Sequence, residues 1–230
     1  MGMELNITDL RWGFGPGQPD FIDLPRLNID AGSAVCLSGP SGSGKTSLLF
    51  LLAGLEKTRV GAIRWGDTDL ASASESQRDL FRRRHIGMVF QDFHLVGGLS
   101  VLENVLLPTR FGRWSPSPAQ FTRAHALLDQ VGLPNPRQRS ATLSRGEMQR
   151  LAVARALLME PSVLIADEPT ASLDADNESH VADLLLALAR EHGVTLLLSS
   201  HQIRLKESAD RCIGLAHGRI VSDLMREVVR

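Results

Sequence analysis

Two kinds of apolar pattern take turns along this chain. Short, nearly continuous apolar runs are typical of buried strands, whereas apolar residues spaced three or four positions apart are typical of helices that bury one face. The expected strands cover residues 34–37, 60–65, 86–90, 163–166 and 194–198, and the expected helices cover about 45–53, 75–84, 101–107, 118–131, 148–159 and 181–188. Buried strands alternating with helices indicate an α/β fold with a largely parallel sheet.

Turn and capping residues refine these boundaries. At several expected helix starts a serine stands three residues before Glu or Gln, which is the spacing of a capping box. Such pairs are Ser100–Glu103, Ser117–Gln120 and, overlapping near residue 75, Ser72–Glu75 and Ser74–Gln77. The overlap leaves the start of that helix open. Residues from about 95 to 143 show almost no strand pattern and are expected to form a helical insert, and residues 213–221 are expected to form a terminal hairpin.

Composition narrows the class of protein. The 230 residues suffice for one large or two small domains, and 43% hydrophobic with 22% charged residues is ordinary for a globular protein. A net charge of −1 gives no support for binding nucleic acid through bulk charge. The apolar runs are too short to span a bilayer, and the first residues lack the pattern of a signal peptide. We therefore expect a soluble, cytoplasmic protein. Cys36 and Cys212 lie in apolar runs and are expected to be small buried residues.

The strongest chemical signal is a glycine-rich loop between an expected strand and an expected helix. It reads Gly39-Pro40-Ser41-Gly42-Ser43-Gly44-Lys45-Thr46, followed by Ser47. This fits the P-loop pattern, in which backbone amides and the positive end of the helix cradle phosphates. Lys45 is then expected to reach the β and γ phosphates and Thr46 to ligate Mg²⁺. An ordinary glycine turn is the weaker interpretation because Lys-Thr follows the last glycine.

A second signal is a pair of carboxylates at the end of a buried strand, Asp167 and Glu168. Ligands bind at the carboxyl ends of such strands. Beside a P-loop, the first acid is expected near Mg²⁺ and the second is expected to polarise the attacking water. A strand that merely exits into solvent is the alternative.

The third signal is the run from Leu143 to Arg150. Ser144 and Glu147 have capping-box spacing ahead of the helix that is expected from Met148. An ordinary helix start and an anion site coincide here, because a helix N-terminus with a free hydroxyl and a glycine backbone binds anions. If the helical insert carries this loop away from its own P-loop, it can serve the nucleotide of a second subunit.

Together these motifs make the chain similar, over essentially its whole length, to the ATP-binding cassette (ABC) ATPases that drive membrane transporters. The run from Leu143 resembles their signature loop, and Gln91, after an expected strand, resembles the Q-loop glutamine. The stretch from Ala171 to Asp174 resembles the D-loop, and His201 resembles the switch histidine. The resemblance implies a RecA-like P-loop NTPase core with a mainly parallel sheet, an N-terminal antiparallel β subdomain and an inserted α-helical subdomain.

The resemblance also implies a site. ATP and Mg²⁺ are the implied cofactors, and two copies are implied to close head to tail, each nucleotide lying between one P-loop and the partner's signature loop. Catalytic roles are implied for Glu168 as general base and for His201 and Lys45 in stabilising phosphoryl charge. Metal contacts are implied for Thr46, Gln91 and Asp167. Nucleotide contacts are implied for the P-loop residues 39–47 and for Gln91, Ser144 and Gly146.

Two positions depart from the family pattern. Arg145 replaces the first glycine of the signature loop, so it lacks the conformational freedom of glycine and adds a charge. We expect it to slow hydrolysis or to tighten the dimer. The chain also has no tyrosine, the usual residue that stacks on adenine. Trp12 is expected to replace it, with Phe14 as the alternative. The competing interpretation of Trp12 is an aromatic residue that packs against the sheet.

The stretch from Phe90 to Pro108 resembles the lipoprotein-releasing, macrolide-export and cell-division group of these ATPases. The resemblance implies an energy-coupling subunit, peripheral on the cytoplasmic face of the inner membrane, that moves a permease of the force-transmitting type. We expect one ABC domain over residues 1–230, with a core of about 1–94 and 150–230 and a helical subdomain of about 95–149. The alternatives are a non-transport ABC ATPase and a weakly hydrolysing, ATP-dependent clamp. No nucleic-acid partner is expected.

Overall fold

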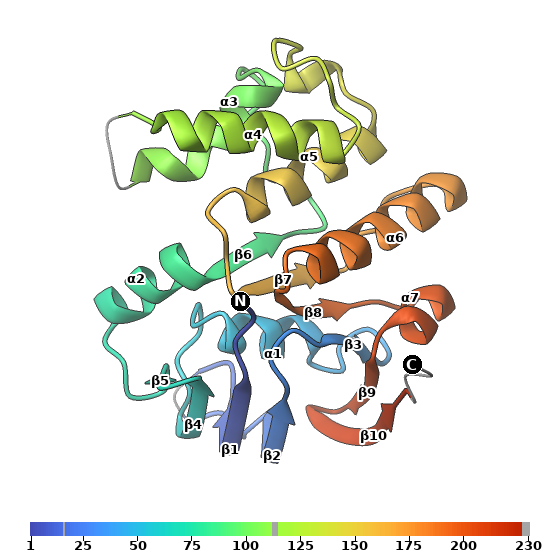
Figure 1. Cartoon of the computed structure of the whole chain (residues 1–230). Coiled ribbons are helices and arrows are strands. Elements are labelled where there is room, and N and C mark those ends of the chain that lie inside the picture. Colours follow the sequence, from blue (N-terminus) through green and yellow to red (C-terminus); the bar gives the residue numbers. More distant parts are fainter. Residues whose placement is uncertain (16, 112–114, 227–230) are drawn as a thin grey trace.

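The computed structural model describes residues 1–15, 17–111 and 115–226. It contains two sheets with helices around them (Figure 1). The expected α/β architecture, with a mainly parallel sheet and a separate antiparallel sheet, is confirmed. Residues 112–114, within the expected helical insert, lie outside the described residues.

A six-stranded sheet forms the centre of the molecule, in the order β10-β9-β3-β8-β7-β6. Its strands are β3 (Ala34–Ser38), β6 (Ile86–Val89), β7 (Val163–Asp167), β8 (Thr195–Ser199), β9 (Arg211–Ala216) and β10 (Arg219–Met225). All neighbours pair in parallel except β9 and β10, which form the expected terminal hairpin. The carboxyl ends of β3, β7 and β8 therefore meet at one edge of the sheet, where ligands of such folds bind.

The four-stranded antiparallel sheet lies below the central sheet in Figure 1. It has the order β2-β1-β4-β5, formed by β1 (Leu5–Trp12), β2 (Ile22–Ile29), β4 (Val60–Trp65) and β5 (Thr68–Asp69). Along β1 the buried positions shift from Leu5 and Ile7 to Leu10 and Trp12. The pairing with β4 shifts register between Thr8 and Arg11, because β1 has an extra residue there. The side chains that face the core therefore change from odd-numbered to even-numbered positions.

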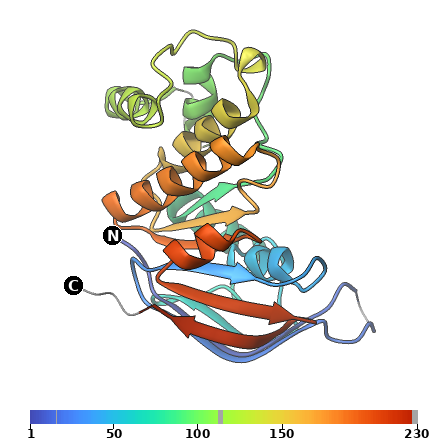
Figure 2. The same ribbon diagram turned by 90° about the vertical axis from the view of Figure 1, so that its right-hand side faces the viewer.

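Seven α-helices are described: α1 (Lys45–Leu52), α2 (Glu75–His85), α3 (Val101–Leu106), α4 (Pro118–Gln130), α5 (Arg145–Leu157), α6 (Ala175–Glu191) and α7 (Ile203–Ser208). Short 3₁₀ helices cover Leu107–Phe111 and Ser140–Thr142. Helix α1 is enclosed between the two sheets, whereas α5 and α6 cover the other face of the central sheet (Figures 1 and 2). Helices α3 and α4 lie farthest from the antiparallel sheet (Figure 1).

Alternation along β3 divides the hydrophobic core in two. Val35 and Leu37 pack with α1 and the antiparallel sheet, while Ala34 and Cys36 pack with α5 and α6. Burial raises the pKa of the Cys36 thiol to about 12, which suits its expected role as a small apolar residue. Cys212 is only partly buried.

Capping settles two boundaries that the sequence left open or misplaced. Ser74, and not Ser72, caps α2, with both bonds of the capping box formed. Ser144 caps α5, so this helix starts at Arg145 and not at Met148. Helix α7 and strand β5 were not expected, because neither is long enough to show a period.

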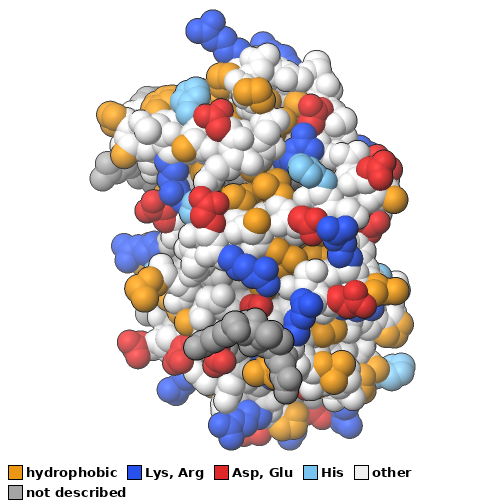
Figure 3. Space-filling view, turned by 45° about the vertical axis from the view of Figure 1, so that its right-hand side comes forward, with side chains coloured by type: hydrophobic (Ala, Val, Ile, Leu, Met, Phe, Trp, Pro, Cys, Tyr) orange, Lys and Arg blue, Asp and Glu red, His pale blue; other side chains and the backbone are white. Residues whose placement is uncertain are grey.

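No helix in the described ranges is both long and apolar enough to cross a membrane. On the face shown in Figure 3, basic and acidic side chains are interspersed, with apolar side chains between them. Charge on this face is therefore mixed in sign.

Candidate functional site

The loop between β3 and α1 is shaped for a bound anion. Gly39 has φ +146°, and a Cβ there would lie 2.2 Å from the Leu215 carbonyl oxygen. Gly44, at the N-cap of α1, is left-handed with φ 105°, and no side chain caps the helix. Because the first amides of a helix have no intrahelical partner, those of α1 remain available to phosphate oxygens. The buried Ser43 hydroxyl also has no hydrogen-bond partner among the described residues.

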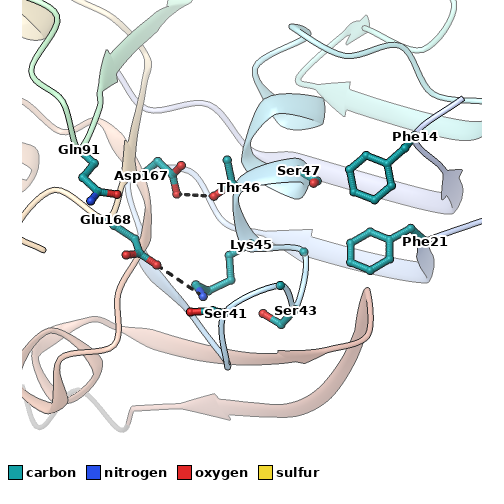
Figure 4. A pocket seen from close by; sticks show the side chains of 12 residues that line it. Phe14, Phe21, Ser41, Ser43, Lys45, Thr46, Ser47, Gln91, Asp167 and Glu168 are labelled. Carbon is teal, nitrogen blue, oxygen red and sulfur yellow. Dashed lines mark hydrogen bonds and ion pairs between the residues drawn. The ribbon is translucent and has the colours of Figure 1, made fainter.

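A cavity of about 440 Å³ opens beside this loop (Figure 4). Its lining residues are Phe14, Phe21, Ser41, Gly42, Ser43, Gly44, Lys45, Thr46, Ser47, Gln91, Asp167 and Glu168. The structure thus brings most of the P-loop together with Gln91 and the carboxylate pair, from segments far apart in the sequence. Gly39 and Pro40 contribute carbonyl oxygens that contact Lys45.

The ammonium group of Lys45 lies at the centre of this arrangement. It donates to the carbonyl oxygens of Gly39 at 3.0 Å and Pro40 at 3.3 Å. It also lies 3.2 Å from Nε2 of His201 and 3.6 Å from Oε1 of Glu168. His201 Nε2 is in turn 3.1 Å from the same Glu168 oxygen. Only 5% of the Lys45 side chain is exposed, so these contacts compensate a buried charge.

A single hydroxyl joins the two acidic residues. Ser199 Oγ donates to Asp167 Oδ1 at 2.7 Å and accepts from the Glu168 amide at 2.8 Å. Thr46 Oγ1 donates to the same Asp167 oxygen at 3.1 Å. Glu168 has φ 44°, an uncommon conformation that aims its carboxylate at Lys45. No motif in the sequence pointed to Ser199; the one available signal was its place directly after an expected strand.

Aromatic residues line the far end of the cavity. The Phe14 and Phe21 rings lie 5.2 Å apart between centroids and face the cavity, and Phe14 is 69% exposed (Figure 4). Trp12, the residue first expected to stack on a base, does not line the cavity: it is 7% exposed, packs in the core and supports Phe14 edge-on at 4.8 Å. Its side chain points inward because of the register shift along β1. No motif in the sequence pointed to Phe21 as a residue of this cavity.

The loop before α5 does not line this cavity. Ser144 caps the helix: its amide and hydroxyl both donate to Glu147 Oε2 at 2.8 Å, and its hydroxyl accepts from the Glu147 amide at 3.4 Å. These bonds hold the pKa of Glu147 below its usual value. Gly146 is buried, and a Cβ there would lie 2.5 Å from Asn177 Oδ1. Arg145 is exposed and helical, so this position does not require glycine.

The P-loop, the paired carboxylates at the end of β7 and the histidine after β8 define a P-loop nucleoside triphosphatase. A family model described as ABC transporter matches residues 23–171. The lipoprotein-releasing system ATP-binding protein LolD of Syntrophotalea carbinolica is 39% identical, covering 94% of this chain and 96% of LolD. The uncharacterized ABC transporter ATP-binding protein YbbA of Escherichia coli is also 39% identical, with the same coverage.

Among solved structures, a dimeric ATP-binding cassette, MJ0796, in a post-hydrolysis state with ADP and Pi is similar, with a TM-score of 0.84 and 30% identity. The match covers 96% of this chain and 98% of that one. The chain therefore belongs to the ABC transporter family and is an ATP-hydrolysing, energy-coupling subunit of a transporter.

Proposed function

We propose that the chain hydrolyses ATP in the 440 Å³ cavity, with the triphosphate held by residues 39–47. The observation that carries this proposal is the convergence of Lys45, Glu168 and His201 on one point beside the P-loop. Glu168 takes the proton of the attacking water, and Lys45 and His201 stabilise the charge on the transferring phosphoryl group. Phe14, with Phe21 behind it, offers the flat surface on which the base stacks.

Mg²⁺ fits the oxygen atoms that surround the phosphate site. Thr46 and Asp167 lie in direct contact, and Gln91 lines the same cavity. Hydroxyl, carboxylate and amide oxygens are the hard ligands that Mg²⁺ prefers. When bound, Mg²⁺ neutralises charge on the β and γ phosphates. Ser199 keeps the Asp167 carboxylate oriented toward Thr46.

The site is proposed to be completed by a second copy of the chain. Ser144 and Gly146 lie outside the cavity of their own chain, at the N-terminal end of α5, where the helix dipole favours anions. A head-to-tail dimer brings this loop of one copy over the P-loop nucleotide of the other. The dimeric form of the similar MJ0796 cassette supports a dimer of this chain.

A second, larger cavity of about 890 Å³ lies between α2 and β6 on one side and residues of the 3₁₀ helix Leu107–Phe111, α4 and α5 on the other. Its apolar lining includes Leu80, Met88, Phe111 and Met159. We place the contact with the integral-membrane permease here, because its position between the sheet and the helical layer lets it transmit relative motion. One similar structure, the cassette cbiO1 (27% identical, TM-score 0.85), is described as part of the transporter complex cbiONQ, which supports a permease partner.

The basic end of α2 lies at the rim of this second cavity. Arg83 donates to the Phe111 carbonyl oxygen at 2.9 Å and pairs with Asp79 at 2.8 Å, and Arg84 also lines the second cavity. Both arginines therefore border the proposed permease site.

In this proposal residues of about 95–149 act as the helical subdomain and about 1–94 and 150–230 as the core, and the subunit lies peripherally on the cytoplasmic face of the inner membrane. A force-transmitting permease is favoured because LolD, a similar protein, belongs to a lipoprotein-releasing system. A weakly hydrolysing clamp is less favoured, because Glu168 and His201 are both present and in contact. A non-transport ATPase is less favoured because the similar protein LolD belongs to a lipoprotein-releasing system.

Glu168→Gln tests the assignment of the general base. Removing the base is expected to lower kcat at least ~100-fold while ATP binding is retained. ATP hydrolysis by purified chain, ATP binding and ATP-driven dimerisation are measured together. Glu56→Gln is the matched control, because Glu56 is exposed and does not line the cavity. Parental hydrolysis by Glu168→Gln contradicts the assignment.

A further inference from the structure

The turn that follows Gln91 has an unusual backbone. Phe93 has φ 57° and His94 has φ 48°, so two successive residues other than glycine are left-handed. Such conformations persist only where surrounding contacts determine them. Gln91 lines the nucleotide cavity two residues earlier, so the conformation of this turn affects where the Gln91 backbone lies.

The C-terminal part of helix α5 makes hydrogen bonds that hold this turn. Arg155 donates to the carbonyl oxygens of Phe93 and His94, at 2.6 Å each. Burial lowers the pKa of Arg155, as expected for a guanidinium taken out of water to bind the backbone. The Phe90 and His94 rings also pack edge to face at 4.8 Å.

The first residue of the same helix contacts the same turn. The guanidinium carbon of Arg145 lies over the Phe93 ring, 5.6 Å from its centroid. Phe93 is 8% exposed, so its ring is fixed and presents one face to the arginine. This distance is within the range of a cation–π interaction. A glycine, the family residue at this position, has no side chain to make the contact.

We propose that Arg145 is a positioning residue that ties the turn after Gln91 to the start of α5. This rests on the proposed function, in which Ser144 and Gly146 contact the nucleotide of the partner subunit and Gln91 contacts the nucleotide of its own chain. Arg145 and Arg155 together clamp the turn to one helix. A movement of α5 that brings Ser144 onto the partner's phosphate therefore moves Gln91 with it, so the two nucleotide sites of the dimer are coupled through this helix.

Amide hydrogen exchange without added nucleotide tests the contact itself. The informative amides are those of Phe93, His94 and Val96, which donate to Phe90 O, Asp92 O and Asn104 Oδ1. Arg145→Gln removes the cation and keeps a good helix former, and is expected to speed their exchange about two- to five-fold, the equivalent of ~0.5–1 kcal/mol. Arg145→Lys keeps a cation, so its exchange rates at these amides are expected to lie between those of the parent and those of Arg145→Gln. The Met148 amide, bonded to Ser144 O, is the internal reference.

Arg137→Gln is the matched control, because it removes an exposed arginine of the same region and is expected to leave exchange of the turn unchanged. Unchanged exchange in Arg145→Gln overturns the proposal. This measurement involves no hydrolysis, so its result is independent of whether Glu168 is the general base.

Steady-state hydrolysis then distinguishes positioning from direct contact with phosphate. If Arg145 positions Gln91, Arg145→Gln lowers kcat about two- to five-fold with little change in KM, and adds nothing further in a Phe93→Leu background. If Arg145 instead binds the partner's phosphate, KM rises and the effect persists in Phe93→Leu, which overturns the proposal. A rise in kcat, the result expected of a brake, also overturns it.

Discussion

Two helix starts are expected to face phosphate, α1 after the P-loop and α5 after Leu143, and they are built in opposite ways. At α1 the N-cap is a left-handed glycine with no side-chain cap, so the first amides remain available to a ligand. At α5 a complete capping box uses the Ser144 hydroxyl and the Glu147 carboxylate to satisfy each other. The first start is therefore completed by a ligand, whereas the second is a stable helix start in its own right.

The largest expected effect concerns Gly146, where the second start is tightly packed. An added Cβ lies 2.5 Å from Asn177 Oδ1, so Gly146→Ala is expected to destabilise the chain by ~1–3 kcal/mol in urea unfolding, although Gly→Ala in a helix usually stabilises. Gly98→Ala, with nothing within 4 Å, is the control and should change stability little. Asn177→Ala should relieve the loss; an equal loss in that background contradicts the packing argument.

A smaller effect separates an ordinary cap from a functional one. Ser144 and Ser117 form the same capping box on α5 and α4. Either serine changed to alanine should cost ~0.5–2 kcal/mol of stability. Only Ser144→Ala should also raise KM for ATP in a hydrolysis assay, because only that hydroxyl is proposed to meet phosphate. Equal kinetics for the two variants would show that Ser144 is a cap and nothing more.

The smallest expected effect is a pH dependence of the stability that the capping box of α5 contributes. Hydrogen bonds from Ser144 lower the pKa of Glu147 below its ordinary 4.5. A carboxylate whose pKa is lower in the folded state contributes stability above the unfolded value and loses it as pH falls through the folded value. Glu147→Gln cannot lose a charge, so its stability difference from the parent should shrink below about pH 4.5, as followed by urea unfolding. A difference independent of pH contradicts this origin.

Most of the fold followed from local patterns, because buried strands and capped helices are encoded within short windows of sequence. The P-loop was recognisable for the same reason: Gly39 to Thr46 are contiguous. The start of α5 at Arg145 was misplaced by three residues because its first turn carries few apolar residues, although Ser144 already marked it.

Contacts between distant segments were harder to foresee. Ser199 meets Asp167 only because β7 and β8 are adjacent and in register. Which of Trp12 and Phe14 faces the cavity depends on the register shift along β1. The only trace of this shift in the sequence is one three-residue gap between apolar positions, from Ile7 to Leu10, which does not by itself identify a bulge. The contact between Arg145 and Phe93 joins a loop and a helix start that lie far apart in the sequence.

The surroundings of Lys45 imply that nucleotide binding is an exchange of partners. Its ammonium already contacts two carbonyl oxygens, a carboxylate and an imidazole. In the proposed site, a phosphate that accepts from this ammonium group competes with Glu168 and His201 for the same cation, and a group that it displaces stays beside the phosphate. Binding of the substrate's phosphate to Lys45 thus also frees side chains that are proposed to act on that phosphate.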